Sequence, residues 1–121
     1  MTAQRAVEPN HLSQLLVERI NARDVEGLVA LYEDDAVLDT GDGLAIGSAA
    51  IREFWTQFLT TGITVTLGQQ TEALLNGDLA LTSTRLPGGP VTVEVARRQH
   101  DGSWKWAIDQ PALPITTEHK R

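Results

Sequence analysis

A β-hairpin close to the C-terminus constrains the fold more than any other feature of the chain. Residues 94–111, EVARRQHDGSWKWAIDQP, contain two alternating segments separated by Asp101-Gly102, a dipeptide that strongly favours a two-residue hairpin turn. Counting outward from that turn brings Glu94 opposite Asp109. Residues directly opposite each other in an antiparallel pair have Cβ atoms ~5 Å apart. The hairpin is therefore predicted to hold two neighbouring carboxylates deep in its strands rather than at its tip.

The same register assigns every hairpin residue to one face of the sheet, because side chains alternate along a strand. Ala96 and Ala107 share the face of the two carboxylates, where their small side chains leave room for a pocket. The opposite face is predicted to be apolar and to carry Val93, Val95, Trp106 and Ile108.

The first half of the chain has the spacing of helices, and the second half that of strands. Apolar residues at helical intervals predict three helices with Asn10, Asp24 and Ser48 as their N-caps. The apolar face of the second helix is expected to extend to Tyr32. A short strand is predicted over residues 36–39, followed by four strands in the second half.

Two further connections set the register of the predicted sheet. Asn76-Gly77 is a strong turn signal, and a four-residue loop at Pro87–Pro90 places Leu86 opposite Val91. A one-residue bulge in either hairpin would reverse the assignment of faces. With these registers, four more side chains join the carboxylate face: Glu72, Leu81, Ser83 and Arg85.

Helices followed by an antiparallel meander predict an α+β domain, in which three N-terminal helices pack on one face of a curved, mainly antiparallel sheet. A chain of 121 residues has the length of one domain. We place this domain at residues 10–112, between flexible tails at 1–9 and 113–121.

Composition excludes several classes of function. The net charge of −6 argues against nucleic-acid binding, which needs a basic surface. The chain has no cysteine, and its three histidines are far apart in sequence, so we expect no metal, no cofactor and no Ser-His-Asp triad. Without an apolar signal segment or a membrane-spanning run, we expect a cytoplasmic protein with no membrane partner.

Four segments resemble the nuclear transport factor 2-like superfamily: 20–39 (INARDVEGLVALYEDDAVLD), 47–55 (GSAAIREFW), 76–85 (NGDLALTSTR) and 95–111 (VARRQHDGSWKWAIDQP). They are most similar to its bacterial SnoaL-like, ketosteroid isomerase-related branch. The resemblance implies a cone-shaped α+β fold with a small-molecule pocket. Steroid Δ-isomerase, scytalone dehydratase, limonene epoxide hydrolase and SnoaL-like polyketide cyclases share that fold, so the resemblance fixes no single chemistry.

The catalytic residues of two of these enzymes transfer poorly to this chain. At the positions of the steroid isomerase's tyrosine, basic aspartate and protonated acid, the resemblance places Leu16, Thr40 and a residue near Ala96. Steroid isomerisation is therefore not expected. Limonene epoxide hydrolase uses an Asp-Arg-Asp arrangement, which Glu94, Arg85 and Asp109 match in charge only.

From the register and the resemblance together, we predict Asp109, Glu94 and Arg85 as the catalytic residues, with Asp109 as the first choice. Two carboxylates this close are expected to share a proton near neutral pH. Two alternatives stay open: a structural ion pair with Arg85, or solvated carboxylates if the register is wrong. The predicted ligand-binding residues are Leu16, Thr40, Trp55, Phe58, Glu72, Leu81, Ser83 and Ala96.

Three functions fit this reading of the sequence. The first is an isomerase, cyclase or hydrolase that applies carboxylate acid–base chemistry to a compact hydrophobic substrate. The second is a non-catalytic binding protein for a hydrophobic metabolite, and the third is a dimerisation or accessory domain with a vestigial pocket. We also expect a homodimer, because large apolar patches are rarely left exposed on a monomer. The surface predicted for it comprises Ala80, Val93, Val95, Trp106 and Ile108.

Overall fold

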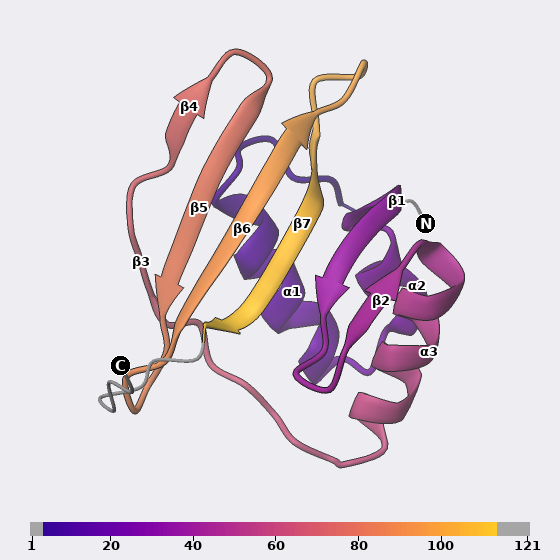
Figure 1. The fold of residues 1–121 in the computed structure, drawn as a ribbon. Coiled ribbons are helices and arrows are strands. Elements are labelled where there is room, and N and C mark those ends of the chain that lie inside the picture. The colour runs from indigo at the N-terminus through magenta and orange to yellow at the C-terminus, as the bar shows by residue number, and fades with distance from the viewer. Residues whose placement is uncertain (1–3, 114–121) are drawn as a thin grey trace, which may run out of the picture.

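The structure, a computed structural model, describes residues 4–113 and has the α+β architecture expected from the sequence (Figure 1). Within these residues the helices are α1 (His11–Asn21), α2 (Val25–Val29) and α3 (Ser48–Leu59). The strands are β1 (Tyr32–Asp39), β2 (Leu44–Ile46), β3 (Gln69–Gln70), β4 (Leu74–Asn76), β5 (Leu79–Arg85), β6 (Val91–Arg98) and β7 (Trp104–Leu113).

The strands form one mixed sheet in the order β2-β1-β7-β6-β5-β3, and β4 pairs with β5. The neighbours β1 and β7 are parallel, while the other pairs are antiparallel. In Figure 1, α1 lies behind the strands β5, β6 and β7, and α3 lies beside β1 and β2. One face of the sheet therefore carries the core, as an amphipathic sheet requires.

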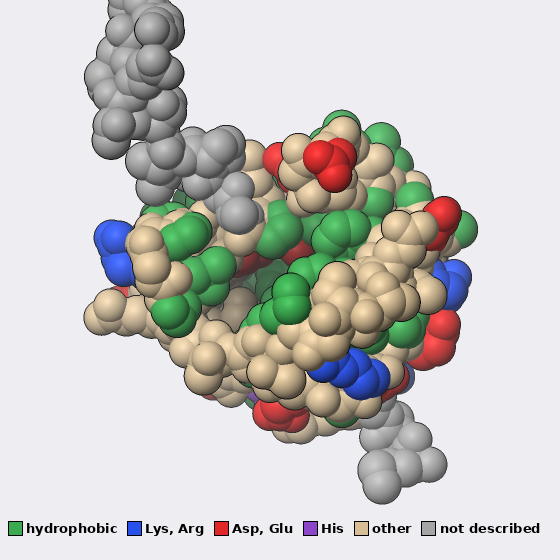
Figure 2. Space-filling view, turned by 90° about the horizontal axis from the view of Figure 1, so that it is seen from below, with side chains coloured by type: hydrophobic (Ala, Val, Ile, Leu, Met, Phe, Trp, Pro, Cys, Tyr) green, Lys and Arg blue, Asp and Glu red, His purple; other side chains and the backbone are tan. Residues whose placement is uncertain are grey.

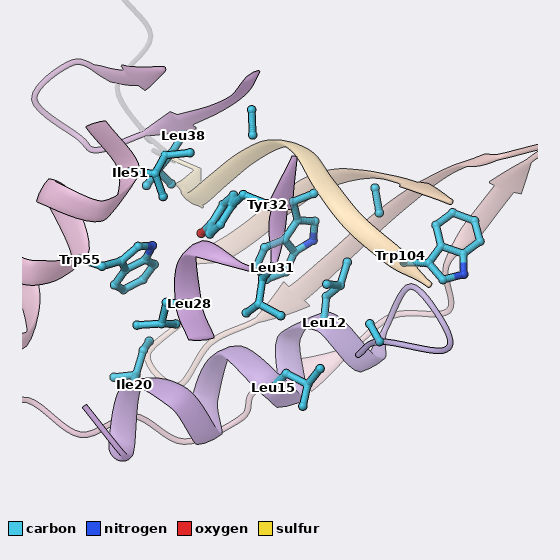
Figure 3. Close-up of a cluster of buried hydrophobic side chains, with 14 of the residues drawn as sticks. Leu12, Leu15, Ile20, Leu28, Leu31, Tyr32, Leu38, Ile51, Trp55 and Trp104 are labelled. Carbon is cyan, nitrogen blue, oxygen red and sulfur yellow. The ribbon is translucent and has the colours of Figure 1, made fainter. Parts of the chain in front are cut away.

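The core fills the space between the helices and this face. Its largest fully buried side chains are contributed by both layers, since Leu12 and Ile51 come from helices whereas Tyr32 and Trp106 come from strands. Figure 3 shows how the helix and strand side chains meet. Burying each of these side chains contributes ~1.5–3 kcal/mol to the free energy of unfolding.

Of the three predicted N-caps, Asp24 caps its helix, since its side chain accepts a hydrogen bond of 2.9 Å from the Gly27 N–H at the start of α2. Asn10 occupies the N-cap position of α1 but makes no capping hydrogen bond, and its side-chain amide donates instead to the Thr71 carbonyl at 2.9 Å. The predicted cap of α3 was one residue late, because Gly47 precedes the helix with a φ of 87°, a conformation that only glycine adopts at little cost. Tyr32 begins β1 instead of ending α2, since it pairs with Trp106 of β7.

The hairpin formed by β6 and β7 pairs Glu94 with Asp109, as the sequence predicts, although its loop and its strand β7 differ from the prediction. The loop has three residues rather than two: the Gln99 N–H donates to the Ser103 carbonyl at 2.7 Å, and Gly102 has a positive φ of 86°. Ala96 then lies opposite Trp106, so Ala107 is an extra residue in β7. This bulge restores the predicted register beyond it.

Two predicted positions are wrong, because the three-residue loop shifts the register between the turn and the bulge. Trp106, assigned to the open face, is 1% exposed and belongs to the core. Ala107 is displaced from the cross-strand partner expected for it, because Ala96 pairs with Trp106.

The register between β5 and β6 differs from the prediction by one residue. Arg85 rather than Leu86 pairs with Val91, and the Leu86 N–H donates to the Pro90 carbonyl at 2.7 Å. Counted between the last ladder pair, Arg85 and Val91, the loop has five residues, 86–90, instead of four. A shift of one residue moves every side chain of β5 to the other face. The side chains on the carboxylate face are Ala80, Thr82 and Thr84, whereas Leu81, Ser83 and Arg85 lie on the opposite face.

The turn between β4 and β5 also lies one residue later than predicted. Asn76 pairs with Leu79, so Gly77 and Asp78 form the loop, and Leu74 rather than Glu72 lies opposite Leu81. Glu72 is exposed and belongs to no strand.

Part of the predicted N-terminal tail packs on the domain. Ala6 is 2% exposed and bridges to Trp104, whose N–H donates to the Ala6 carbonyl at 3.0 Å. Residues 1–3 and 114–121, which belong to the two predicted tails, lie outside the described residues. Within the described range, no helix is long and apolar enough to cross a membrane.

Candidate active site

A cavity of about 270 Å³ lies between the carboxylate face of the sheet and the helices α1 and α3. Its walls come from these helices, from the segment 65–68, and from β5, β6 and β7. Figure 2 shows a hollow with a largely hydrophobic rim and acidic side chains in its depth. The volume lies just below the ~300–1,000 Å³ of most ligand pockets, so the cavity suits a compact molecule.

Two carboxyl groups, from Glu94 and Asp109, line this cavity side by side. They are cross-strand partners in β6 and β7, both contribute to the lining, and each residue is 3% exposed. Neither takes part in an ion pair with a described Lys, Arg or His side chain. Burial without a compensating cation is unfavourable for two ionised groups, so the pair favours a state that holds a proton.

Asp109 is the member of the pair that keeps the proton. Burial raises the pKa of Asp109 to about 8, and the neighbouring negative charge of Glu94 raises it as well. A hydrogen bond from the Tyr32 hydroxyl to Asp109 Oδ2, 2.7 Å long, acts in the opposite direction because it stabilises the ionised form. At neutral pH Asp109 is therefore largely a neutral acid that can donate a proton.

Glu94 has more donors around it. Burial raises the pKa of its carboxyl, while hydrogen bonds from the Thr82 and Thr92 hydroxyl groups lower it. The Thr82 Oγ1 donates to Glu94 Oε1 at 2.6 Å. Because these hydroxyl groups stabilise the carboxylate, Glu94 is the member of the pair that ionises first and can act as a base.

Tyr32 connects the carboxyl pair to the aromatic wall. It is 2% exposed, and burial together with the charge of Asp109 raises the pKa of its hydroxyl well above 10. In Figure 3 the indole nitrogen of Trp55 faces this hydroxyl. The Trp55 indole N–H makes no hydrogen bond of normal geometry. Its proximity nevertheless lowers the pKa of the Tyr32 hydroxyl. Since indole only donates, Tyr32 is left to donate to Asp109.

The wall opposite the carboxyl groups is aromatic. Phe54, Trp55 and Phe58 of α3 all line the cavity. The ring centroids of Phe54 and Trp55 are 5.0 Å apart, and those of Trp55 and Phe58 are 5.3 Å apart, both in edge-to-face arrangements. Such packing holds the rings in fixed orientations, so the wall is preorganised.

The structure brings together about half of the residues predicted for the site. Leu16, Trp55 and Phe58 line the cavity with Glu94 and Asp109. Ala96 lies on the same face of the sheet but is packed in the core. Thr40 lies at the end of β1 and lines a separate, open hollow beside α3.

Four further predicted residues lie outside the cavity. Leu81, Ser83 and Arg85 point to the opposite face of the sheet because of the five-residue loop, and Glu72 is exposed. Arg85 is exposed as well, so it cannot neutralise the buried pair. The ion pair with Arg85 and the Asp-Arg-Asp arrangement are both absent from the described residues.

Four residues at the carboxyl pair or in the cavity wall were not among the predicted site residues: Tyr32, Thr82, Thr92 and Trp106. Alternation within β6 alone places Thr92 on the face of Glu94, whereas the face of Thr82 follows only from the observed register of β5 with β6. The face of Trp106 depends on the length of the loop before it and on the bulge at Ala107, neither of which the alternation of side chains reveals. Tyr32 and Asp109 are 77 positions apart in the sequence, so no local sequence pattern predicts their contact.

Comparison with known proteins identifies the family. A sequence model of the SnoaL-like domain matches residues 14–105, which is most of the chain. The protein belongs to the SnoaL-like domain family, as the resemblance in its sequence implies. Two solved structures that match the chain are described as NTF2-like proteins.

Solved structures agree on the fold. A structure from Thiobacillus denitrificans, named for the calcium/calmodulin-dependent protein kinase type II association domain, matches with a TM-score of 0.73 and 15% identity over 92% of this chain and 100% of the other. A ketosteroid isomerase-like protein from Erwinia carotovora matches with a TM-score of 0.64 and 18% identity over 84% and 89%.

A function-unknown protein from Mycobacterium tuberculosis matches with a TM-score of 0.64 and 19% identity over 84% of this chain. The match spans only 66% of that protein's length. At these identities the likeness concerns the fold alone, and the chemistry must be argued from the site.

Proposed function

We propose that the protein is a small-molecule enzyme that applies carboxylate acid–base chemistry to a compact hydrophobic substrate. The observation that carries this proposal is the placement of Glu94 and Asp109 side by side in one largely apolar cavity. Two titratable groups whose surroundings separate their pKa values are the usual means by which one site supplies both an acid and a base. In this proposal the helices and the curved sheet form a cone, and the cavity is its interior.

Each carboxyl group has its own role in the proposed reaction. Glu94, which the threonine hydroxyl groups stabilise as an anion, removes a proton from the substrate. Asp109, whose pKa is raised by burial, donates a proton to a developing oxyanion or leaving group. Paired transfers of this kind support isomerisation, cyclisation or hydrolysis.

Tyr32 and the aromatic wall support these roles without touching the transferred proton. The Tyr32 hydroxyl holds Asp109 Oδ2, which leaves Oδ1 as the oxygen to face the substrate. Trp55 and Phe58 line the cavity and keep water from the reacting groups, so that electrostatic interactions inside are strong.

A second candidate function is a binding protein for a hydrophobic metabolite. The prevalence of apolar side chains in the lining, among them Leu16, Val17 and Ile20 of α1, favours it, because apolar burial alone retains a ligand. In that case the carboxyl groups orient the ligand and do not transform it.

We also propose a homodimer through the outer sheet face, with a corrected set of residues. Trp106 and Ala80 are buried in the core and take no part. Leu81 and Ile108 are 43% and 51% exposed, and Val93 and Val95 lie beside them on the same face. Together these side chains form an apolar patch of the kind that a second copy covers.

Turnover and binding must be measured on the same compounds to separate the two functions. We suggest compact epoxides, enones and ketones, with NMR detection of product and of deuterium exchange next to the carbonyl group in D₂O. Turnover that Asp109→Asn and Glu94→Gln abolish, while both variants still bind the compound, supports the enzyme. Binding without turnover supports the binding protein, and the absence of both contradicts the proposal.

A further inference from the structure

The buried carboxyl pair has no positive charge to balance it. Among the described residues that line the cavity there is no lysine, arginine or histidine. Three basic side chains of the helices and of β6 have partners elsewhere: Arg97 pairs with Glu33 and Arg98 with Asp78 on the surface, while Arg19 donates to the Gly27 carbonyl. At neutral pH the pair therefore places a net negative charge in a largely apolar cavity.

A buried charge of this kind is unfavourable unless something neutralises it. In an apo-protein the penalty is limited by a shared proton, which is the state that the neighbouring carboxyl groups favour. A cationic ligand would balance the negative charge that remains while the pair keeps that proton. An anionic ligand would add to it, because it would bring a second or third negative charge into the same space.

The remaining walls also suit a cation with a hydrophobic body. Phe54, Trp55 and Phe58 lie on α3, and Trp106 lies on β7, all in the lining. The faces of aromatic rings attract organic cations, with tryptophan the most effective, and the same rings bury hydrocarbon. The net charge of the chain, −6, favours the approach of cations over that of anions.

We infer that the cavity takes a compact hydrophobic amine, bound as its ammonium ion, with Glu94 as the counter-ion and the aromatic wall around the hydrocarbon part. The inference rests on the proposed function, because it assigns a substrate class to that same cavity. Glu94 is the pairing group because Thr82 and Thr92 stabilise its ionised form. Asp109 stays available as the acid.

Four probes of similar size and shape test the inference: N,N-dimethylbenzylamine, benzyl methyl ketone, isobutylbenzene and phenylacetate. They share a benzyl group and differ in charge, being respectively a cation, a neutral acceptor, a hydrocarbon and an anion. Dissociation constants come from NMR titration at pH 7, in which the indole N–H signals of Trp55 and Trp106 report on the cavity. We expect the amine to bind about tenfold more tightly than the ketone or the hydrocarbon, and phenylacetate to bind most weakly.

The variant Glu94→Gln keeps the size of the side chain and an acceptor for the Thr82 hydroxyl, but it removes the charge. It should abolish the preference for the amine and leave the binding of the ketone and the hydrocarbon nearly unchanged. Glu72→Gln, a matched change at an exposed carboxylate outside the cavity, should leave the order of the four probes as it is in the wild type.

The outcomes separate this inference from the proposed function. If the ketone binds as tightly as the amine, or if the preference for the amine survives in Glu94→Gln, the amine assignment is wrong while the cavity remains a ligand site. If none of the four probes binds, the cavity is not a site for compact hydrophobic molecules, and both proposals fall together.

Discussion

The Tyr32 hydroxyl donates a 2.7 Å hydrogen bond to Asp109 Oδ2, and this contact ties the first residue of β1 to the acid of the candidate site. The parallel pairing of β1 with β7 makes it possible, because Tyr32 lies opposite Trp106 and Leu38 lies opposite Asp109. The hydrogen bond lowers the pKa of Asp109 while burial raises it. The acid strength of the site thus results from a balance between one buried donor and the loss of water.

The first prediction concerns Tyr32→Phe. Removing the hydroxyl takes away a donor that stabilises the ionised carboxylate, so the pKa of Asp109 should rise above its value of about 8. Carboxyl ¹³C NMR titration measures this directly. Asp109 should move, whereas the exposed turn carboxylate of Asp101, with a pKa of about 2, provides an internal control that should not. An unchanged or lowered pKa of Asp109 would contradict the assignment of Tyr32 as the donor.

The second prediction concerns stability and pH. Asp109 binds its proton more tightly in the folded chain, with a pKa of about 8, than in the unfolded chain, where the ordinary value of 3.8 applies. Between these values the folded state holds the extra proton, so the free energy of unfolding should fall as the pH rises from about 4 to 8. Below pH 4 both states are protonated and the effect should vanish.

Asp109→Asn removes this penalty and should stabilise the protein. The gain over the wild type should be small at pH 4 and should grow toward pH 8, by at most about 1.4 kcal/mol per pH unit for one titrating group. Urea unfolding at a series of pH values measures it, with Asp42→Asn at an exposed turn as the matched control. A gain that does not depend on pH would mean that Asp109 is not the buried titrating group.

The third prediction tests the register of β5 with two adjacent substitutions. Thr82→Val removes the hydroxyl that donates to Glu94 Oε1, so it should raise the pKa of Glu94 and lower the free energy of unfolding by about 2 kcal/mol at neutral pH. Ser83→Val lies on the outer face opposite Val93 and should change stability little. Equal effects of the two substitutions, or a larger effect of Ser83→Val, would favour the four-residue loop over the observed five-residue loop.

The neighbouring carboxyl groups could be predicted from sequence because two local deviations compensate each other. The loop at His100–Gly102 is one residue longer than Asp101-Gly102 alone suggests, and the bulge at Ala107 shifts the register back. Neither deviation has a signal in the alternation of side chains, since a bulge adds one residue without a change of composition. The pairing of Glu94 with Asp109 was therefore right, while the face of Trp106 was wrong.

The loop between β5 and β6 had no such compensation. Gly88 and Gly89 both have positive φ values, 90° and 108°, and glycines accept such angles in loops of several lengths. The sequence could not distinguish four residues from five, and one residue decides whether Arg85 or Thr84 faces the cavity. The start of α2 was easier to predict, because the capping side chain of Asp24 acts on its own helix.

The last prediction concerns the outer sheet face. Ile108 is 51% exposed and lies opposite Val95, so Ile108→Lys would place a charge within the proposed dimer interface. We expect the wild type to be a dimer at micromolar concentration and Ile108→Lys to be a folded monomer, as measured by light scattering coupled to size-exclusion chromatography and by circular dichroism. Leu44→Lys, at an exposed leucine on the edge strand β2, which β1 separates from β7, should remain dimeric. A monomeric wild type, or a dimer that tolerates lysine at position 108, would show that the apolar patch on β5, β6 and β7 is not the interface.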